Sequence, residues 1–329
     1  MPDKNRERPK ISVIVPIFGV EKYIERCARS LFEQTLMDIE FIFIDDCTLD
    51  NSMAILNRVI DEYRPRFAGM SWTVRTERML ANSGQAAVRK HGIQLCRGEY
   101  VIHCDSDDWV DANMYEVMYE AAVREDADMV VCDYYISDGV TQERRIGCHT
   151  NTVREYFENL LYQKDNWVLW NKMFRRSVYT NDFIYPKYAM GEDCVFCLQL
   201  VWNSKNITYV DKPYYYYYNN GMSITRDNSE ENVLRKFQQS VANAEDIFAF
   251  MKRSNLYDKY SDAVDSIFFN KKNILLPLIS SNEYFQLWKK TFPELNYRIF
   301  LNKRVPLRRK FNHMMALLPL RKYYYHYGK

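Results

Sequence analysis

Short hydrophobic runs alternate with amphipathic segments over residues 11–137 of the chain. Runs rich in β-branched residues and bounded by polar or turn residues predict buried strands at 11–18, 41–46, 72–77, 100–105 and 127–137. Between them, hydrophobic positions at helical spacing predict helices at 21–35, 52–63, 83–96 and 113–126. Such alternation is typical of βαβ units, so we expect an α/β fold with a mostly parallel sheet flanked by helices.

The pattern changes after about residue 140. Helical spacing predicts helices at 153–163, 193–203 and 231–253, and the tyrosine run 214–218 is expected to include a strand with alternate tyrosines buried. Residues 226–299 have a helical and irregular pattern without a recognisable motif. We therefore expect a first domain over 1–225, a mainly helical C-terminal region over 226–299 and a separate tail over 300–329.

Acidic residues follow two of the predicted strands, at Asp45–Asp46 and at Asp105–Asp108. In open parallel sheets, ligands bind beyond the carboxyl ends of the strands, so both acidic groups are candidate site residues. One alternative is a solvated turn with helix caps, and Asp111 is expected to cap the helix that follows. A calcium loop is excluded because Trp109 and Val110 occupy positions that require a ligand and a glycine. The remaining alternative is a site for Mg²⁺ or Mn²⁺ that also holds a polyphosphate.

The composition fits a globular protein, with 47% hydrophobic and 27% charged residues. No apolar run reaches the length of about 18 residues that a membrane-spanning helix needs, and the N-terminus lacks the pattern of a signal peptide. We therefore expect a cytoplasmic protein whose eight scattered cysteines are reduced. Cys194 and Cys197 form a single C-x-x-C pair with no second pair nearby, which does not favour a zinc or redox site.

Basic residues are concentrated at the end of the chain. Residues 300–329 contain eight of the 45 Lys and Arg and none of the 43 Asp and Glu. In this tail, apolar positions repeat at helical spacing at Leu307, Phe311, Met314, Met315 and Leu318, whereas Arg308, Arg309, Lys310 and His313 fall outside that stripe. A basic amphipathic helix can bind an anionic membrane surface, here the inner face of the plasma membrane, or can dock on the catalytic domain. No motif indicates a nucleic-acid partner.

A series of short motifs runs through the first 225 residues. They are S-V-I-V-P at 12–16, E-K-Y-I at 21–24, Q-T at 34–35, I-D-D at 44–46, D-N-S at 50–52, N-S-G at 82–84, Arg89, G-E-Y at 98–100, D-S-D-D-W at 105–109, W-N-K at 170–172, G-E-D at 191–193 and S-I-T at 223–225. In order and spacing they resemble the inverting glycosyltransferases of family 2, of the bacterial surface-polysaccharide type. The resemblance implies the GT-A fold, a Rossmann-like sheet that binds a nucleotide sugar.

The resemblance also assigns roles to individual residues. It implies donor binding by Pro16, Phe18, Asp45, Asp46, Asn82, Gly84, Arg89, Asp105, Ser106, Asp107, Asp108 and Lys172. Within this set, Asp107 would be the metal ligand, with Asp105 facing the nucleotide sugar beside the metal. Asp193 would be the catalytic base, with Glu192 as the alternate. The family usually has Tyr-Asn where this chain has Phe18-Gly19, so a hydroxyl and an amide are missing from the expected base-binding region.

The implied reaction is transfer of a hexosyl or N-acetylhexosaminyl group from a nucleotide sugar, expected to be a UDP-sugar, with Mg²⁺ or Mn²⁺ as cofactor. The acceptor would be a hydroxyl of a glycan or lipid-linked molecule in the synthesis of cell-surface polysaccharide or glycolipid. One alternative is a sugar-phosphate nucleotidyltransferase, which usually has a glycine-rich, arginine-bearing loop where this chain reads PIFGVEKYIER. The other is a non-catalytic module that binds sugar nucleotides.

Overall fold

The computed structural model describes residues 8–219 and 229–318. The chain divides into two compact units, one formed by Met1–Tyr185 with Phe196–Gly221 and the other by Pro186–Val195 with Met222–Lys329. The expected boundary between residues 225 and 226 and the motif at 223–225 lie outside the described residues, and the separate status of 300–329 stays a prediction. Each unit is described by itself below.

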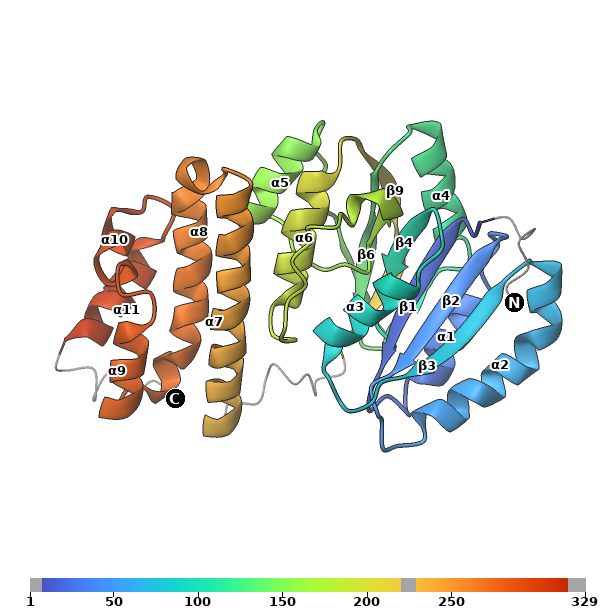
Figure 1. Ribbon diagram of the computed structural model, residues 1–329, viewed down its shortest axis with the longest axis horizontal. Coiled ribbons are helices and arrows are strands. Elements are labelled where there is room, and N and C mark those ends of the chain that lie inside the picture. The colour runs from blue at the N-terminus through green and yellow to red at the C-terminus, as the bar shows by residue number, and fades with distance from the viewer. Residues whose placement is uncertain (1–7, 220–228, 319–329) are drawn as a thin grey trace. The chain divides into compact units, whose positions relative to one another are not determined.

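The first unit is built on one sheet, in which the described strands follow the order β3-β2-β1-β4-β8-β6-β9-β5, with β7 beside β6 (Figure 1). The strands are β1 (Ile11–Ile17), β2 (Ile39–Asp45), β3 (Thr73–Arg78), β4 (Tyr100–His103), β5 (Trp109–Val110), β6 (Met129–Ser137), β7 (Gln142–Arg145), β8 (Lys172–Arg175) and β9 (Ile207–Tyr218). Strands β3, β2, β1 and β4 are parallel, as are β6 and β9, whereas β8 runs antiparallel to β4 and β6. The predicted mostly parallel α/β sheet is thus confirmed.

The central strands are rich in apolar residues because of their position in the sheet. In β1, β2 and β4 nearly every side chain is buried, because helices cover both faces of the sheet. Ile17 pairs in register with Asp45, and Ile14 pairs with His103, so the acidic residues that follow β2 and β4 emerge at the same edge. This carboxyl edge of the sheet carries the candidate site.

Helices α1 (Ile24–Phe32), α2 (Ser52–Gly69) and α4 (Met114–Arg124) contribute apolar side chains to one large core with the sheet. Helix α3 (Gln85–Leu95) contacts β1 and β2 from the other face, and a methyl group on its Gly92 would lie 2.5 Å from Ile14. The remaining helical elements are α5 (Val153–Leu161), η1 (Arg176–Val178) and α6 (Glu192–Asn203). The division between the two units falls within α6, between Val195 and Phe196. All eight cysteines are free, as expected.

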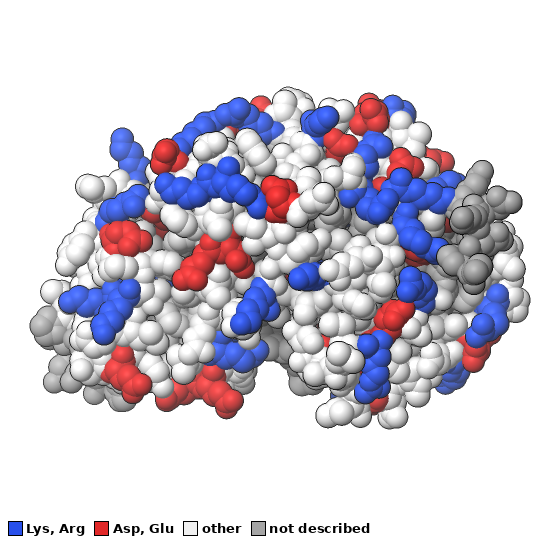
Figure 2. Space-filling model, viewed as in Figure 1, with Lys and Arg blue, Asp and Glu red and all other residues white. Residues whose placement is uncertain are grey.

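The second unit is helical in its described part, which confirms the expectation for residues 226–299 (Figure 1). It contains α7 (Glu230–Arg253), α8 (Tyr257–Lys272), η3 (Asn273–Leu278), α9 (Asn282–Lys290), α10 (Leu295–Leu301) and α11 (Leu307–Leu317). A small core joins them and includes Phe237, Leu275, Trp288 and Ala316. Within residues 8–219 and 229–318, no helix combines the length and hydrophobicity that crossing a bilayer requires. Figure 2 shows basic and acidic side chains interspersed over the visible face of both units.

Two local predictions were wrong. Tyr214 and Tyr215 in β9 are both buried, at 7% and 0% exposed, although they are neighbours. The ladder between β6 and β9 has register shifts just before this point, which interrupt the simple alternation of faces. Asp111 is not the cap of α4, because the helix begins at Met114 after Asn113 and the Asp111 side chain accepts only the Asn113 N–H, at 3.5 Å.

Candidate active site

Asp46, at the end of β2, fixes the N-S-G segment to the sheet. Its two carboxylate oxygens accept hydrogen bonds from the N–H groups of Ser83, at 2.7 Å, and Gly84, at 2.8 Å. Gly84 has φ +79°, which favours glycine, and it stands immediately before α3. Asp46 therefore places Asn82, which is exposed, and the start of α3 at the carboxyl edge. Each carboxylate oxygen of Asp46 already accepts one hydrogen bond, so binding of a nucleotide base would require one of them to accept a second.

Asp45 is also held by neighbouring groups. Its carboxylate accepts a hydrogen bond from the Thr48 N–H at 2.7 Å and pairs with Arg78 at 3.1 Å. Near the end of β1, Pro16 is partly buried and Phe18 is 50% exposed. Phe18 thus offers an aromatic face of the kind on which a nucleotide base can stack.

Arg89 and Asp105 form a buried ion pair behind the acidic segment. Arg89, on α3, is 1% exposed, and its Nη2 donates to Asp105 Oδ1 at 3.0 Å. Gln85 Nε2, one turn earlier on the same helix, donates to the same oxygen at 3.2 Å. Asp105 stays 24% exposed, so it is anchored from one side and accessible from the other. Arg89, expected among the donor-binding residues, thus contacts the acidic segment directly.

Asp107 is the second accessible carboxylate. Burial, together with the nearby charge of Asp105, raises the pKa of Asp107 to about 6. Ser106, between the two aspartates, is 6% exposed. Two partly exposed carboxylates that disfavour each other's charge are a donor set that a hard divalent cation would stabilise. The residues present therefore fit the expected Mg²⁺ or Mn²⁺.

Asp108 has a structural environment. It is 0% exposed, and its oxygens accept hydrogen bonds from the Tyr215 hydroxyl at 2.6 Å and the Tyr218 N–H at 2.7 Å. Tyr215 also accepts the Asp105 N–H at 3.1 Å. Burial, with Asp107 and Asp105 adding to it, raises the pKa of Asp108 well above its ordinary value. Asp108 thus ties the acidic segment to β9, and its contact with donor hydroxyls stays a prediction.

Arg26, on α1, lies at the site but was missed in the sequence. Its guanidinium stacks over the rings of Trp109, at 3.7 Å, and Tyr218, at 4.5 Å, and Nη2 donates to the Asp107 carbonyl at 3.0 Å. Burial lowers the pKa of Arg26, whereas Tyr218, Asp108 and Asp107 oppose that shift. Trp109 also stacks on Tyr216 at 5.1 Å, so its ring belongs to an aromatic cluster.

Lys172, expected among the donor-binding residues, has its partners in its own segment, and its contact with the donor stays a prediction. It is 0% exposed, and its Nζ donates to the Val168 carbonyl at 2.8 Å and to Asn171 Oδ1 at 2.9 Å. Longer contacts join it to Asn166. The lysine therefore stabilises the turn before β8, because a buried ammonium needs acceptors and finds them among local oxygens.

The expected base belongs to the second unit. Gly191, with φ +81°, precedes α6, and Glu192 and Asp193 form the first turn of that helix. Asp193 is partly exposed, whereas Glu192 is only 4% exposed. Acidic side chains in the first turn stabilise a helix, so both residues also suit a structural role at this position. The difference in exposure makes Asp193 the better candidate of the two.

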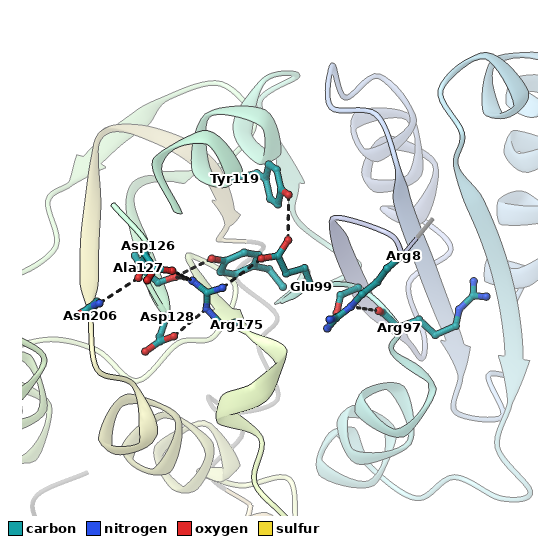
Figure 3. A network of polar contacts seen from close by, with 11 residues as sticks. Arg8, Arg97, Glu99, Tyr119, Asp126, Ala127, Asp128, Arg175 and Asn206 are labelled. Carbon is teal, nitrogen blue, oxygen red and sulfur yellow. Dashed lines mark hydrogen bonds and ion pairs between the residues drawn. The ribbon is translucent and has the colours of Figure 1, made fainter. Parts of the chain in front are cut away.

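A second polar cluster surrounds Arg175 at the amino-terminal edge of the parallel strands (Figure 3). Arg175 pairs with Asp126 at 2.7 Å, Asp128 at 2.9 Å and Glu99 at 3.3 Å, and Tyr119 donates to Glu99 at 3.2 Å. It borders a cavity of about 230 Å³. Because acidic groups already compensate Arg175, this cluster is a structural junction between β4, β6 and β8.

A group of Asp133, His149 and Asp211 was not found in the sequence either. Among the described residues, these three side chains place their possible ligand atoms within 4.8 Å of one another, close enough to hold a metal ion. However, His149 presents Nε2 to Asp133 at 3.6 Å and Nδ1 to Asp211 at 3.4 Å, so its ring lies between the carboxylates. Asp133 also accepts from Arg144 at 2.8 Å and from the Gly147 N–H at 3.0 Å. A cation would compete with Arg144, so this arrangement is better suited to an ion-pair network.

The sheet order and its helical layers define a GT-A fold, and comparisons with known proteins identify the family. Residues 12–184 match glycosyl transferase family 2, and the chain belongs to this family. It is 28% identical over 269 residues to the putative glycosyltransferase EpsH of Bacillus subtilis, covering 79% of this chain and 74% of EpsH. It is also 28% identical over 269 residues to a cholesterol galactosyltransferase of Borreliella burgdorferi, covering 76% and 72% of the two chains. A crystal structure of S. aureus TarS in complex with UDP-GlcNAc has the same fold, with a TM-score of 0.55 and 17% identity over 97% of this chain and 92% of that chain.

The protein is therefore a glycosyltransferase that uses a nucleotide sugar, as the motifs predicted. Family membership decides against the nucleotidyltransferase and the non-catalytic module. The expected donor-binding residues at the ends of β2 and β4, together with the start of α3, lie at one edge of the sheet, with Lys172 as the exception.

Proposed function

We propose that the protein is a metal-dependent inverting transferase of a hexosyl or N-acetylhexosaminyl group from a UDP-sugar. The observation that carries the proposal is the pair of accessible carboxylates after β4, Asp105 anchored by Arg89 and Asp107 with its pKa raised to about 6. The UDP-GlcNAc bound to TarS supports a UDP-linked donor. The galactosyl specificity in the name of one relative leaves the sugar open among these types.

Asp107, with Asp105 beside it, would hold a divalent cation, which would neutralise charge on the diphosphate leaving group. Phe18 would stack on the base, and Asp45 and Asp46 would hold the loop and helix that approach the donor. The N–H groups at the start of α3 form a further favourable surface for phosphate.

In the proposed reaction, Asp193 accepts the proton of the acceptor hydroxyl. The acceptor oxygen attacks the anomeric carbon and forms the new glycosidic bond as the bond from that carbon to the diphosphate breaks. The leaving UDP takes the bonding electron pair, and the configuration at the anomeric carbon inverts. The acceptor is proposed to be a hydroxyl of a glycan or glycolipid of the cell surface.

The test is a screen of UDP-sugars for release of UDP, with Mn²⁺, with Mg²⁺ and with EDTA. We expect one UDP-hexose or UDP-N-acetylhexosamine to be turned over only when metal is present. Asp107→Asn should abolish metal-dependent UDP binding, whereas Asp193→Asn should abolish transfer and leave UDP binding unchanged. Full turnover by Asp193→Asn, or UDP binding that EDTA does not affect, would refute the corresponding assignment.

We also propose that α10 and α11 bind an anionic membrane surface, where a lipid-linked acceptor would be found. Helices α10 and α11, with the residues between them, expose large apolar side chains: Tyr297 72%, Leu301 84%, Leu307 82%, Phe311 51% and Met314 41%. Exposed Lys303 and Arg308 lie among them in the sequence, Arg304 is paired with Asp262, and residues 300–318 contain no acid. Each cation contributes about 1 kcal/mol near an anionic surface.

Vesicle sedimentation tests this surface. The triple variant Leu301→Ser, Leu307→Ser, Phe311→Ser should lose binding to phosphatidylglycerol vesicles and keep its thermal stability, because the three side chains are largely exposed. Val140→Ser, which removes an apolar side chain that is 91% exposed in the other unit, is the control. Equal binding by the triple variant, or equal binding of the natural protein to neutral phosphatidylcholine vesicles, contradicts the proposal.

A further inference from the structure

Helix α7 holds the segment that leads into the G-E-D motif. Asn243 is 1% exposed, and its Nδ2 donates to two carbonyls of that segment, that of Tyr188 at 2.8 Å and that of Met190 at 3.0 Å. One turn earlier on the same helix face, Gln239 Oε1 accepts the Met190 N–H at 3.3 Å. The Met190 N–H and the Met190 carbonyl are thus each held by an amide side chain of α7.

Helix α8 approaches the next residue. Gly191 has φ +81°, and a methyl group at this position would lie 2.5 Å from Lys271 Nζ. The absence of a side chain at residue 191 therefore lets an ammonium group sit against the backbone directly before Glu192 and Asp193. Contacts from α7 and α8 converge on residues 188–191, immediately before the carboxylates of α6.

We propose that Asn243, Gln239 and Lys271 are positioning residues for catalysis, which set the place and direction of the Asp193 carboxylate. This inference rests on the proposed role of Asp193 as base. Under this proposal the helical unit contributes to the reaction, because side chains of α7 and α8 hold the segment that precedes the base. A general base must lie within hydrogen-bond reach of the proton it takes, and a displacement of about 1 Å can reduce a rate on the order of 100-fold.

The chemistry of the two amides suits this role. The Asn243 amide supplies two N–H donors on one nitrogen, which matches two carbonyl oxygens that face it. An aspartate at this position would present oxygens to both carbonyls, so Asn243→Asp should disturb the segment more than Asn243→Ala. The Gln239 contact is longer and single, so its loss should have the smaller effect.

The closing experiment measures kcat, the KM for the donor and UDP affinity in variants of α7. We expect Asn243→Ala and Asn243→Asp to lower kcat about 10- to 100-fold, and Gln239→Ala less, with donor KM and UDP affinity within twofold of the natural protein. Gln238→Ala, an exposed glutamine beside Gln239, is the matched control and should be unchanged. A kcat within twofold of the natural value in both Asn243→Ala and Gln239→Ala overturns the proposal, and so does a parallel loss of UDP affinity, which would indicate general unfolding.

Combination with Asp193→Asn separates this inference from the proposed function. If Asn243 acts through Asp193, then Asn243→Ala should not lower the residual rate of Asp193→Asn any further. Full activity of Asp193→Asn would refute the base assignment itself, whereas an inactive Asp193→Asn with an unaffected Asn243→Ala would refute only the positioning role. If Asn243→Ala does not fold, Gln239→Ala, at a half-buried position, gives the same comparison.

Lys271 is tested through Gly191. Lys271→Ala should lower kcat by about tenfold, and Gly191→Ala, which displaces the ammonium and strains the backbone, should lower it at least as much. Because both changes break one contact, the double variant should show less than the product of the two losses. If the two losses of kcat multiply in the double variant, Lys271 is not a positioning residue.

Discussion

Neighbouring aspartates of the D-S-D-D segment lie in opposite environments, and substitution should separate their roles. Asp108 is 0% exposed and accepts hydrogen bonds from Tyr215 and Tyr218, whereas Asp107 is partly exposed beside Asp105. We expect Asp108→Asn to destabilise the first unit. Asp107→Asn should leave its stability unchanged or slightly higher and should remove metal-dependent binding of UDP.

The magnitude for Asp108→Asn follows from its two contacts. Asparagine keeps one oxygen and replaces the other by an N–H₂ group, which would face either the Tyr215 hydroxyl or the Tyr218 N–H. One buried hydrogen bond to a charged group is then lost, at about 1.5–3 kcal/mol. Relief of the repulsion from Asp107 and Asp105 offsets part of this loss, so we expect a net cost of about 1–2 kcal/mol. For a unit of about 200 residues, the Tm should fall by about 2–8 °C.

The assay is thermal and urea unfolding of the natural protein, Asp107→Asn, Asp108→Asn and Tyr215→Phe, with a UDP titration of each in Mn²⁺ and in EDTA. Tyr215→Phe should destabilise by a similar amount, and the Asp108→Asn, Tyr215→Phe pair should be less than additive because the two residues share one hydrogen bond. The reasoning fails if Asp108→Asn is as stable as the natural protein, or if Asp107→Asn destabilises as much as Asp108→Asn does.

Three further changes probe residues around and beyond this segment. Arg26→Ala removes a guanidinium stacked 3.7 Å from Trp109 and should weaken UDP binding in Mn²⁺ by on the order of tenfold in a calorimetric titration, with unchanged affinity as the contrary result. Asp46→Asn leaves one of two part-buried N–H groups without its acceptor and should cost about 1 kcal/mol in urea unfolding; a neutral effect would contradict its anchoring role. Burial lowers the pKa of His313 to about 4, so it stays neutral in the folded protein while the unfolded chain takes up a proton. Stability should therefore be fully present above pH 6.5 and should fall by up to about 3 kcal/mol as the pH decreases to 4, a slope that His313→Leu should reduce.

The parallel half of the sheet could be predicted because strands that are buried on both faces have short runs of mostly apolar residues. Strands β1 and β2 are mostly apolar, with Ser12 and Glu40 as buried polar exceptions, and β2 ends in the aspartates Asp45 and Asp46. The same regularity places Asp45–Asp46 and Asp105 at one edge of the sheet. By contrast, β5 and β8 are short and were not predicted, because their pairing depends on partners far along the chain.

Candidate residues were harder to assign because a motif does not reveal burial. Lys172 and Asp108 belong to motifs rich in functional groups, yet both are 0% exposed; Lys172 is satisfied by oxygens of its own segment and Asp108 by Tyr215 and Tyr218 on β9. Arg26 shows the opposite case. Its position at the site depends on β9, which brings Tyr218 beside Trp109, and this long-range packing leaves no pattern in the sequence around residue 26.

The basic tail shows why two alternatives from the sequence need not exclude each other. Helix α11 is docked on the other helices of the second unit, because His313 and Ala316 are 1% and 0% exposed, and His313 packs against the rings of Trp288 in α9 and Phe300 in α10. The docked face is not the apolar stripe that the sequence predicted, since Leu307 is 82% exposed. A helix held through its other side can offer that stripe to a membrane while it stabilises the unit beneath. Deletion of 300–329 would remove both functions at once, so only substitutions on the exposed stripe can measure membrane binding alone.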